Sequence, residues 1–396
     1  MASTQAGIFM RARFVPLVLC VLLGCQRDAA PDAAARSAEA PAVRGYVMAR
    51  WYDEIPKEDP GECPDGLNIT EVEYFPEQWK AFMAERQRVR EAEGRFIRWD
   101  HPLLPPDACQ DPLSQPDPGY ITLDGPAKVA GLDLDGIAST RAGAGGADGA
   151  GANACAHDDF TSPTGEAGID NQAWRLMGCV RGYRPNDLMD RLHQANTMIK
   201  EGGYAILMEI SGMDDPRNDD AVEVQLLSAA APVTLDAVGE PMEQVSFTAH
   251  ADPTYHSAWA RGRIEDGILT TDPVDLRLKI KQQTQDNAVF LRDARIRAEV
   301  DGEGRIVGIL GAYWDAANFW SMMNDHTIGG TPQGRNAAFN RGFMCAGLYH
   351  AIPRVADGHP DPTTGRCTSI STALHFEAKP AFVIRPQLAA AERAGE

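Results

Sequence analysis

Residues 274–300 carry the pattern that most constrains the fold. Apolar and polar side chains alternate from Val274 to Ile280, and they alternate again from Ala294 to Val300. A period of two places the apolar side chains on one face, which is typical of an antiparallel sheet with one solvated face. The Gly-containing loop 301–304 and the apolar run from Arg305 to Tyr313 then predict a hairpin.

The wider pattern favours a mainly β fold with flanking helices. Between these strands there is no helix of the length that a crossover connection needs, which disfavours a parallel α/β sheet. We therefore expect an antiparallel β-sandwich or a jelly-roll-like double sheet. Further strands are predicted at 204–210, 222–227 and 381–384, and helices at 76–93, 186–201, 316–324 and 337–352.

Composition and pattern divide the chain into six segments. They are a signal peptide (1–24), an Ala/Pro-rich tether (25–44), an irregular region with one helix (45–130), an acidic, disulfide-closed segment with a helix (131–203), the β-sandwich (204–315) and a helical C-terminal region with a disulfide (316–396). The last four segments are the ones expected to fold.

The N-terminus predicts where the protein resides. Basic residues precede a short apolar run, Phe14 to Gly24, which is too short to span a bilayer of roughly 30 Å and is typical of a secretory signal. The run ends Leu22-Leu23-Gly24-Cys25, which resembles the lipobox of bacterial lipoproteins. The resemblance implies that acyl chains anchor Cys25 to a membrane. Gln26 after the cysteine favours the outer membrane of the cell envelope, and a plain signal peptide or short anchor is the alternative.

The charge balance excludes one class of partner. The 396 residues include 37 Lys and Arg against 56 Asp and Glu, a formal net charge of −19. Nucleic-acid binding requires clustered basic residues, so we expect no nucleic-acid partner. The chain also lacks a P-loop and a G-x-G-x-x-G motif, which gives nucleotide binding no support. The lack of a G-x-S-x-G elbow disfavours an α/β-hydrolase.

Cysteine usage agrees with export. Of the eight cysteines, Cys20 leaves with the signal and Cys25 takes lipid. An even number then remains, which favours disulfides in an oxidising compartment. The remaining cysteines are Cys63, Cys109, Cys155, Cys179, Cys345 and Cys367. Six cysteines allow 15 pairings, and we expect sequential pairs because each such pair falls inside one segment. The lack of any C-x-x-C pair disfavours zinc.

Residues 131–179 hold the candidate metal site. Ca²⁺ takes six to eight oxygen ligands, and alternating acids around a glycine turn can direct several oxygens to one point. The predicted ligands are Asp133, Asp135, Asp158, Asp159, Asp170 and Asn171. The piece around Asp133 and Asp135 resembles the calcium loops of EF-hands and thrombospondin type 3 repeats. Gly131 and Ala142 stand where an EF-hand has acidic ligands, so an EF-hand is excluded. The alternative is turn chemistry without metal.

Two further groups could carry chemistry. His250, Asp252 and His256 lie in a loop and could bind a transition metal or act as a general base. A second group could form a stacking platform for a ligand, although such aromatic residues more often belong to the core. That group consists of Trp314, Asp315, Asn318 and Trp320.

These patterns together predict a lipid-anchored protein of the cell envelope that calcium stabilises. Its expected role is non-catalytic binding or assembly, with an envelope protein or a glycan as partner. The alternative is a periplasmic metal-dependent enzyme that uses His250, Asp252 and His256.

Overall fold

The computed structural model describes residues 42–55, 63–98, 101–123, 128–139, 155–184, 191–201, 203, 205–282, 285–324, 327–328, 331–332 and 341–386. The described residues belong to one compact unit. The predicted lipidation site at Cys25 and the predicted N-cap Asn186 lie outside the described residues. In the part of the chain that is described, no helix has the length and apolar character needed to cross a membrane.

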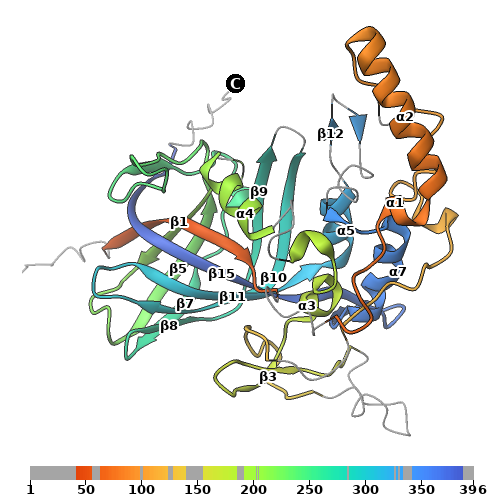
Figure 1. The fold of residues 1–396 in the computed structure, drawn as a ribbon. Helices are drawn as coiled ribbons and strands as arrows, with labels where there is room; N and C mark the ends of the chain where they lie inside the picture. Colours follow the sequence, from red (N-terminus) through yellow and green to blue (C-terminus); the bar gives the residue numbers. More distant parts are fainter. Residues whose placement is uncertain are drawn as a thin grey trace, which may run out of the picture. The chain divides into compact units, whose positions relative to one another are not determined.

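The main sheet is built from strands that come from both ends of the chain (Figure 1). Its central path contains β1 (Val43–Asp53), β4 (Ile206–Ser211), β5 (Asp219–Ser228), β7 (Ala260–Glu265), β8 (Ile268–Thr271), β10 (Gln285–Val300), β11 (Ile306–Asp315) and β15 (Cys367–Ile384), in that order. All neighbours on this path pair antiparallel. The prediction of a mainly β fold with antiparallel pairing is therefore confirmed.

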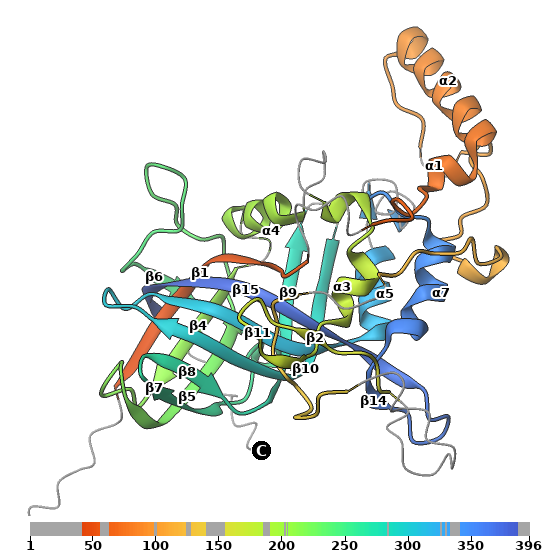
Figure 2. The same cartoon turned by 60° about the horizontal axis from the view of Figure 1, so that its bottom comes forward.

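The sheet closes on itself, because β1 pairs with β4 on one side and with β15 on the other. The two facing layers that a sandwich would have are here two walls of one sheet (Figure 2). Three strands extend the sheet: β9 (Val274–Gln282) pairs with β10, β14 (Gly358–Pro360) pairs with β15, and β6 (Ser246–Thr248) runs parallel to β15. Two small hairpins, β2–β3 (Phe160–Thr161, Ala167–Ile169) and β12–β13 (Thr327–Ile328, Thr331–Pro332), lie outside it.

One apolar cluster joins the walls of the sheet. Leu226, Ile296, Leu310 and Phe376 are buried in it, each with at most 5% of its surface exposed. Burying one such side chain stabilises the fold by about 1.5–3 kcal/mol. A cavity lined by Leu226, Ile296 and Leu310 measures only about 10 Å³, about the space of one water molecule. Side chains fill this part of the interior, so this cavity is too small to hold an organic ligand.

The predicted helices are found. Helix α2 (Pro76–Glu93) begins at Pro76 and ends at Gly94, whose φ of 64° is the left-handed conformation that favours glycine. Helix α5 (Ala316–Asn324) has the predicted bounds, and α4 (Arg191–Lys200) and α7 (Cys345–Val355) overlap the predicted ranges. The structure adds two short helices, α1 (Glu71–Tyr74) and α3 (Gln172–Met177), and three single turns at Pro112–Ser114, Arg181–Tyr183 and Pro253–Tyr255.

The sequential disulfide pairing is wrong. The bonds are Cys63–Cys179, Cys109–Cys345 and Cys155–Cys367, with Cα–Cα distances of 5.8, 4.9 and 5.6 Å. Each joins cysteines more than a hundred residues apart, with separations of 116, 236 and 212. The prediction assumed that each segment closes on itself, whereas the fold packs the segments against one another.

Non-reducing peptide mapping should recover these three cross-linked pairs. The oxidised protein should also show no free thiol among the six when it is denatured without reductant. Recovery of a Cys155–Cys179 peptide in place of Cys155–Cys367 would contradict this arrangement of the chain.

Candidate metal centre

A cover segment, residues 128–139 and 155–177, packs on the outer face of β11 and β15 (Figure 2). Gly311 on β11 leaves room for it, because a Cβ atom there would come within 3.0 Å of Leu132 and Leu134. The backbone N–H of Gln172 donates to Ser371 Oγ at 2.9 Å, which ties the start of α3 to β15. The segment therefore holds its acidic residues against the sheet.

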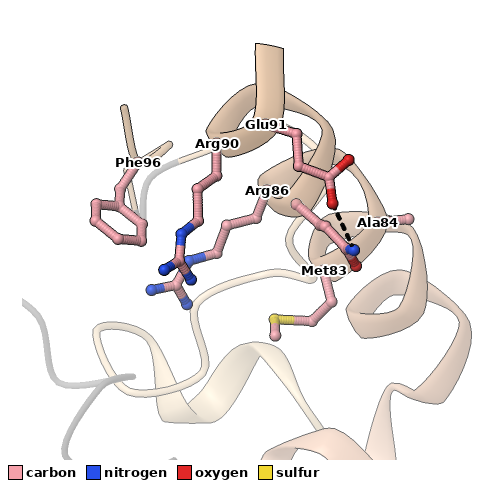
Figure 3. Close-up of a pocket in the computed structure, with 7 residues that line it drawn as sticks. Met83, Ala84, Arg86, Arg90, Glu91 and Phe96 are labelled. Atoms are coloured by element: carbon pink, nitrogen blue, oxygen red, sulfur yellow. Dashed lines mark hydrogen bonds between the residues drawn. The ribbon is translucent and has the colours of Figure 1, made fainter. Parts of the chain in front are cut away.

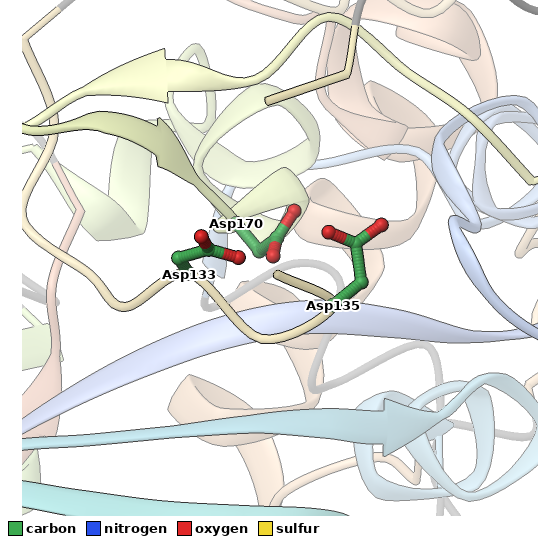
Figure 4. A group of neighbouring side chains, drawn as sticks. All are labelled: Asp133, Asp135 and Asp170. Atoms are coloured by element: carbon green, nitrogen blue, oxygen red, sulfur yellow. The ribbon is translucent and has the colours of Figure 1, made fainter. Parts of the chain in front are cut away.

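Three of the predicted ligands meet in this segment (Figure 4). Asp133, Asp135 and Asp170 each offer a carboxylate oxygen, and these oxygens all lie within 4.8 Å of one another. Asp170 reaches the group because its backbone N–H donates to Leu132 O at 2.9 Å, which pairs the two stretches of chain. We call Asp133, Asp135 and Asp170 the carboxylate group.

Turn bonds hold the carboxylate group in shape. Asp133 Oδ1 accepts from Gly136 N at 2.7 Å, Asp135 Oδ1 accepts from Ile137 N at 2.8 Å, and Asp170 Oδ2 accepts from Leu134 N at 2.7 Å. The alternative interpretation, in which these aspartates only stabilise turns, therefore accounts for these hydrogen bonds. A turn uses one oxygen of each carboxylate, and turn chemistry by itself does not explain why three carboxylates converge.

Bringing these carboxylates together costs free energy when all of them are ionised and no cation is bound. Burial is the largest cause that raises the pKa of Asp170, to about 8, and Asp357, Asp159 and Asp135 raise it further against the bond from Leu134. Burial and the charges of Asp135 and Asp133 raise the pKa of Asp159 to about 6. Like charges in a low-dielectric site favour neutral carboxyls unless a positive ion lies between them.

Asp357 is a member of this neighbourhood that the sequence analysis missed. Burial is the main cause that raises its pKa, to about 7, and the charge of Asp159 contributes. Its backbone N–H donates to Ser369 O at 3.0 Å, and its Oδ1 accepts from Ser371 N at 2.7 Å. Asp357 follows α7, far along the chain from the acidic block, and no motif surrounds it.

The other predicted ligands have different positions. Asp159 accepts a hydrogen bond from Ser139 N beside the carboxylate group. The backbone carbonyl of Asp158 accepts from Gln172 Nε2 at 3.2 Å and Arg175 Nη2 at 2.8 Å, and its side chain is exposed. Asn171 Nδ2 donates to Glu54 O and Ala130 O, each at 3.0 Å, while its buried Oδ1 has no hydrogen-bond partner among the described residues. Asp158 lies outside the carboxylate group.

The histidine loop forms a local turn. His250 Nδ1 accepts from Asp252 N at 3.1 Å, and Asp252 Oδ1 accepts from Thr254 N at 2.9 Å. His256 Nε2 lies 2.7 Å from His250 O, and it donates there because a carbonyl oxygen only accepts. Within the described ranges, the carboxylate group is the only set of three His, Cys, Asp or Glu side chains close enough to share an ion.

The aromatic candidates contact one another and their neighbours within the fold. Trp314 is 7% exposed, and its Nε1 donates to Asn318 Oδ1 at 2.9 Å. Asn318 is equally buried and donates to Ala288 O on β10 at 2.8 Å. Asp315 accepts from Asn318 N in the first turn of α5 and pairs with Arg292, while Trp320 packs against Tyr349. These contacts fit the core interpretation better than an exposed platform.

A groove lies along α2 (Figure 3). It encloses about 910 Å³ beside Met83, Arg86, Arg90, Glu91 and Phe96. The guanidinium carbons of Arg86 and Arg90 lie 5.5 and 5.2 Å from the centre of the Phe96 ring. Phe96 is 59% exposed, and nothing in the structure shows what covers it.

Comparison of the chain with models of protein families, with curated proteins and with solved structures finds no match.

Proposed function

We propose that the chain is a lipid-anchored protein of the bacterial cell envelope in which the carboxylate group binds one Ca²⁺. The ion stabilises the fold, and the role of the protein is binding or assembly with an envelope protein or a glycan. The proposed calcium site is supported by one observation: carboxylate oxygens of Asp133, Asp135 and Asp170 lie within 4.8 Å of one another.

The chemistry of the group favours calcium over other divalent ions. Its members offer carboxylate oxygens and neither a thiolate nor an imidazole, which disfavours zinc. Asp133 and Asp135 lie on a turn with Gly136, whose φ of 78° requires glycine. Calcium tolerates the variable geometry of such a site and accepts water or carbonyl oxygens as further ligands, whereas magnesium demands near-ideal octahedral geometry.

A stabilising role agrees with the position of the group. Asp170 is only 4% exposed, and the cover segment that carries the group is bonded to β15 through Gln172 and through the Cys155–Cys367 disulfide. The alternative, an enzyme that uses the His250 loop, receives less support. The His250, Asp252 and His256 side chains bond to the backbone of their own turn.

The anchor is tested by Cys25→Ser. The wild-type chain should incorporate labelled fatty acid and sediment with membranes, because two or more acyl chains give stable anchoring. The variant should incorporate none and should be recovered as a soluble or unprocessed chain. Wild-type protein that carries no lipid and is cleaved at another residue would contradict the lipoprotein proposal. The metal part is tested by the effect of calcium on thermal stability.

A further inference from the structure

We propose that the end of the sheet at which β1 begins docks on the surface of the bilayer that holds the lipid anchor. The docking surface lies on the last residues of β15 and on the hairpin 234–242 that leads into β6, and we call it the apolar end. It consists of the exposed side chains of Leu235, Val238, Met242, Phe382 and Ile384. The inference rests on the proposed anchor at Cys25 and adds the surface by which the folded part of the chain meets the membrane.

The last residues of β15 present large apolar side chains to solvent. Phe382 is 60% exposed, and Ile384 is exposed as well. These two residues are two positions apart in a strand, so their side chains lie on the same face. Val383 between them points the other way and packs against the main apolar cluster. The exposed face of this part of β15 is therefore apolar.

The hairpin 234–242 adds further exposed apolar side chains. Met242 N donates to Thr234 O at 2.9 Å, and Leu235 forms a bridge with Pro241, which closes the hairpin. Val238 lies at its tip and is 82% exposed, and Leu235 and Met242 are exposed too. A tip that displays an apolar side chain to water gains free energy when a partner covers it.

Backbone hydrogen bonds hold the hairpin against β15. Gln244 N donates to Pro380 O at 2.7 Å, and Phe382 N donates to Val245 O at 2.9 Å. Phe382 also pairs with the first residue of β6. The exposed side chains of the hairpin and of β15 therefore belong to one end of the sheet.

Strand β1 begins at this same end. Gly45 pairs with Ala381, which directly precedes Phe382. In two views the start of β1 lies on the side of the molecule opposite α2 (Figure 1, Figure 2). Val43 follows Cys25 by 18 positions, and 18 residues span at most roughly 60 Å. An acylated Cys25 would therefore keep the start of β1, and with it the apolar end, close to the bilayer.

A bilayer surface fits the chemistry of the apolar end. Apolar side chains gain free energy at the boundary of headgroups and acyl chains, and this contact needs no matching shape. Two carboxylates of the same region are neutralised by ion pairs, Glu240 with Lys200 at 2.6 Å and Glu243 with Arg305 at 2.7 Å. The bilayer is also the partner that the proposed anchor brings to this end of the sheet.

The test attaches residues 26–396 to phosphatidylcholine vesicles through an N-terminal hexahistidine tag and a nickel-chelating lipid, which imitates the anchor without acylation. A second contact beside the tether raises the apparent affinity. Phe382→Ser combined with Ile384→Ser should weaken vesicle binding about tenfold, because burial of one large apolar side chain changes a binding constant by about this factor or more. Flotation of the vesicles at increasing lipid concentration measures the bound fraction.

The matched control is Phe96→Ser, at a phenylalanine that is 59% exposed beside α2. It should bind vesicles like the unsubstituted chain. Val238→Ser should weaken binding in the same direction as the double variant, and it carries the test if the double variant does not fold. Near-ultraviolet circular dichroism shows which variants are folded.

Equal binding by the unsubstituted chain and the folded variants would overturn the inference, and so would an equal loss in Phe96→Ser. Sedimentation without lipid tests the other occupant: a dimer that the double variant converts to a monomer would assign the apolar end to a second copy of the chain and overturn docking on the bilayer. A wild-type chain without lipid on Cys25 would instead overturn the proposed anchor, on which the binding of the tagged chain does not depend.

Discussion

Raising the pH of the calcium-free protein from about 5 to about 8 should lower its free energy of unfolding by a few kcal/mol. The pKa of Asp170 is raised to about 8 and that of Asp357 to about 7 in the folded state, whereas an unfolded aspartate has a pKa of about 3.9. The unfolded chain therefore loses these protons first, and stability falls as the pH rises through this range. One pKa unit corresponds to about 1.4 kcal/mol, so the loss is large beside a typical total of about 5–15 kcal/mol.

The sign of this dependence is opposite to that of a salt-bridged aspartate. The stabilising contribution is fully present below pH about 4 and is lost as the pH rises through the folded pKa values. Chemical unfolding at several pH values in the presence of EDTA measures it. Asp170→Asn should make the curve shallower and leave the contribution of Asp357, because an amide cannot ionise but can still accept the bond from Leu134 N. Calcium-free stability that is constant or rises from pH 5 to pH 8 would show that the carboxyls are ionised in the folded protein.

Adding calcium at pH 8 should raise the melting temperature by several degrees. An ion that binds only the folded state adds about 2.7 kcal/mol at a hundredfold excess over its Kd. The gain should shrink towards pH 5, where protons compete for the same oxygens. EDTA should reverse the gain, and magnesium or zinc should restore it poorly, because a flexible site rich in carboxylates suits calcium better. Differential scanning calorimetry measures all of these effects.

Asp135→Ala should abolish the response to calcium, because it removes one of three converging carboxylates. The matched control is Asp220→Ala, the same change at an exposed position on β5 outside the carboxylate group. The control should respond to calcium like the wild type. A calcium response that survives in Asp135→Ala would place the ion elsewhere, and no response in the wild type would end the case for calcium.

The elements with a clear period could be predicted from the sequence. Alternation predicted strands within β9 and β10, and the glycine-containing loop predicted the β10–β11 hairpin. Strand β1 could not be predicted in this way. Residues Tyr46–Ala49 are all buried, and a strand buried on both faces shows no alternation. Closure of the sheet is likewise a property of pairing between the two ends of the chain.

Some residues of the candidate site could be predicted from the sequence, and others could not. Asp133 and Asp135 could be found because acids around a glycine turn are local. Asp170 was found by the density of acids, but the same density also selected Asp158, which is not one of the converging carboxylates. No local signal marks Asp357. It enters the neighbourhood only because Ser371 on β15 donates a hydrogen bond to it.

The sequence by itself determined the class of fold, the bounds of α2 and α5, the pairing of β10 with β11 and an even set of six cysteines. These features depend on side-chain period, helix ends and composition, which are written within a few residues of one another. Only the tertiary structure decided that the sheet closes, which cysteines pair and which carboxylates converge. Each of these joins residues far apart in the chain. Such contacts depend on how whole segments pack against one another, and the local sequence does not predict that packing.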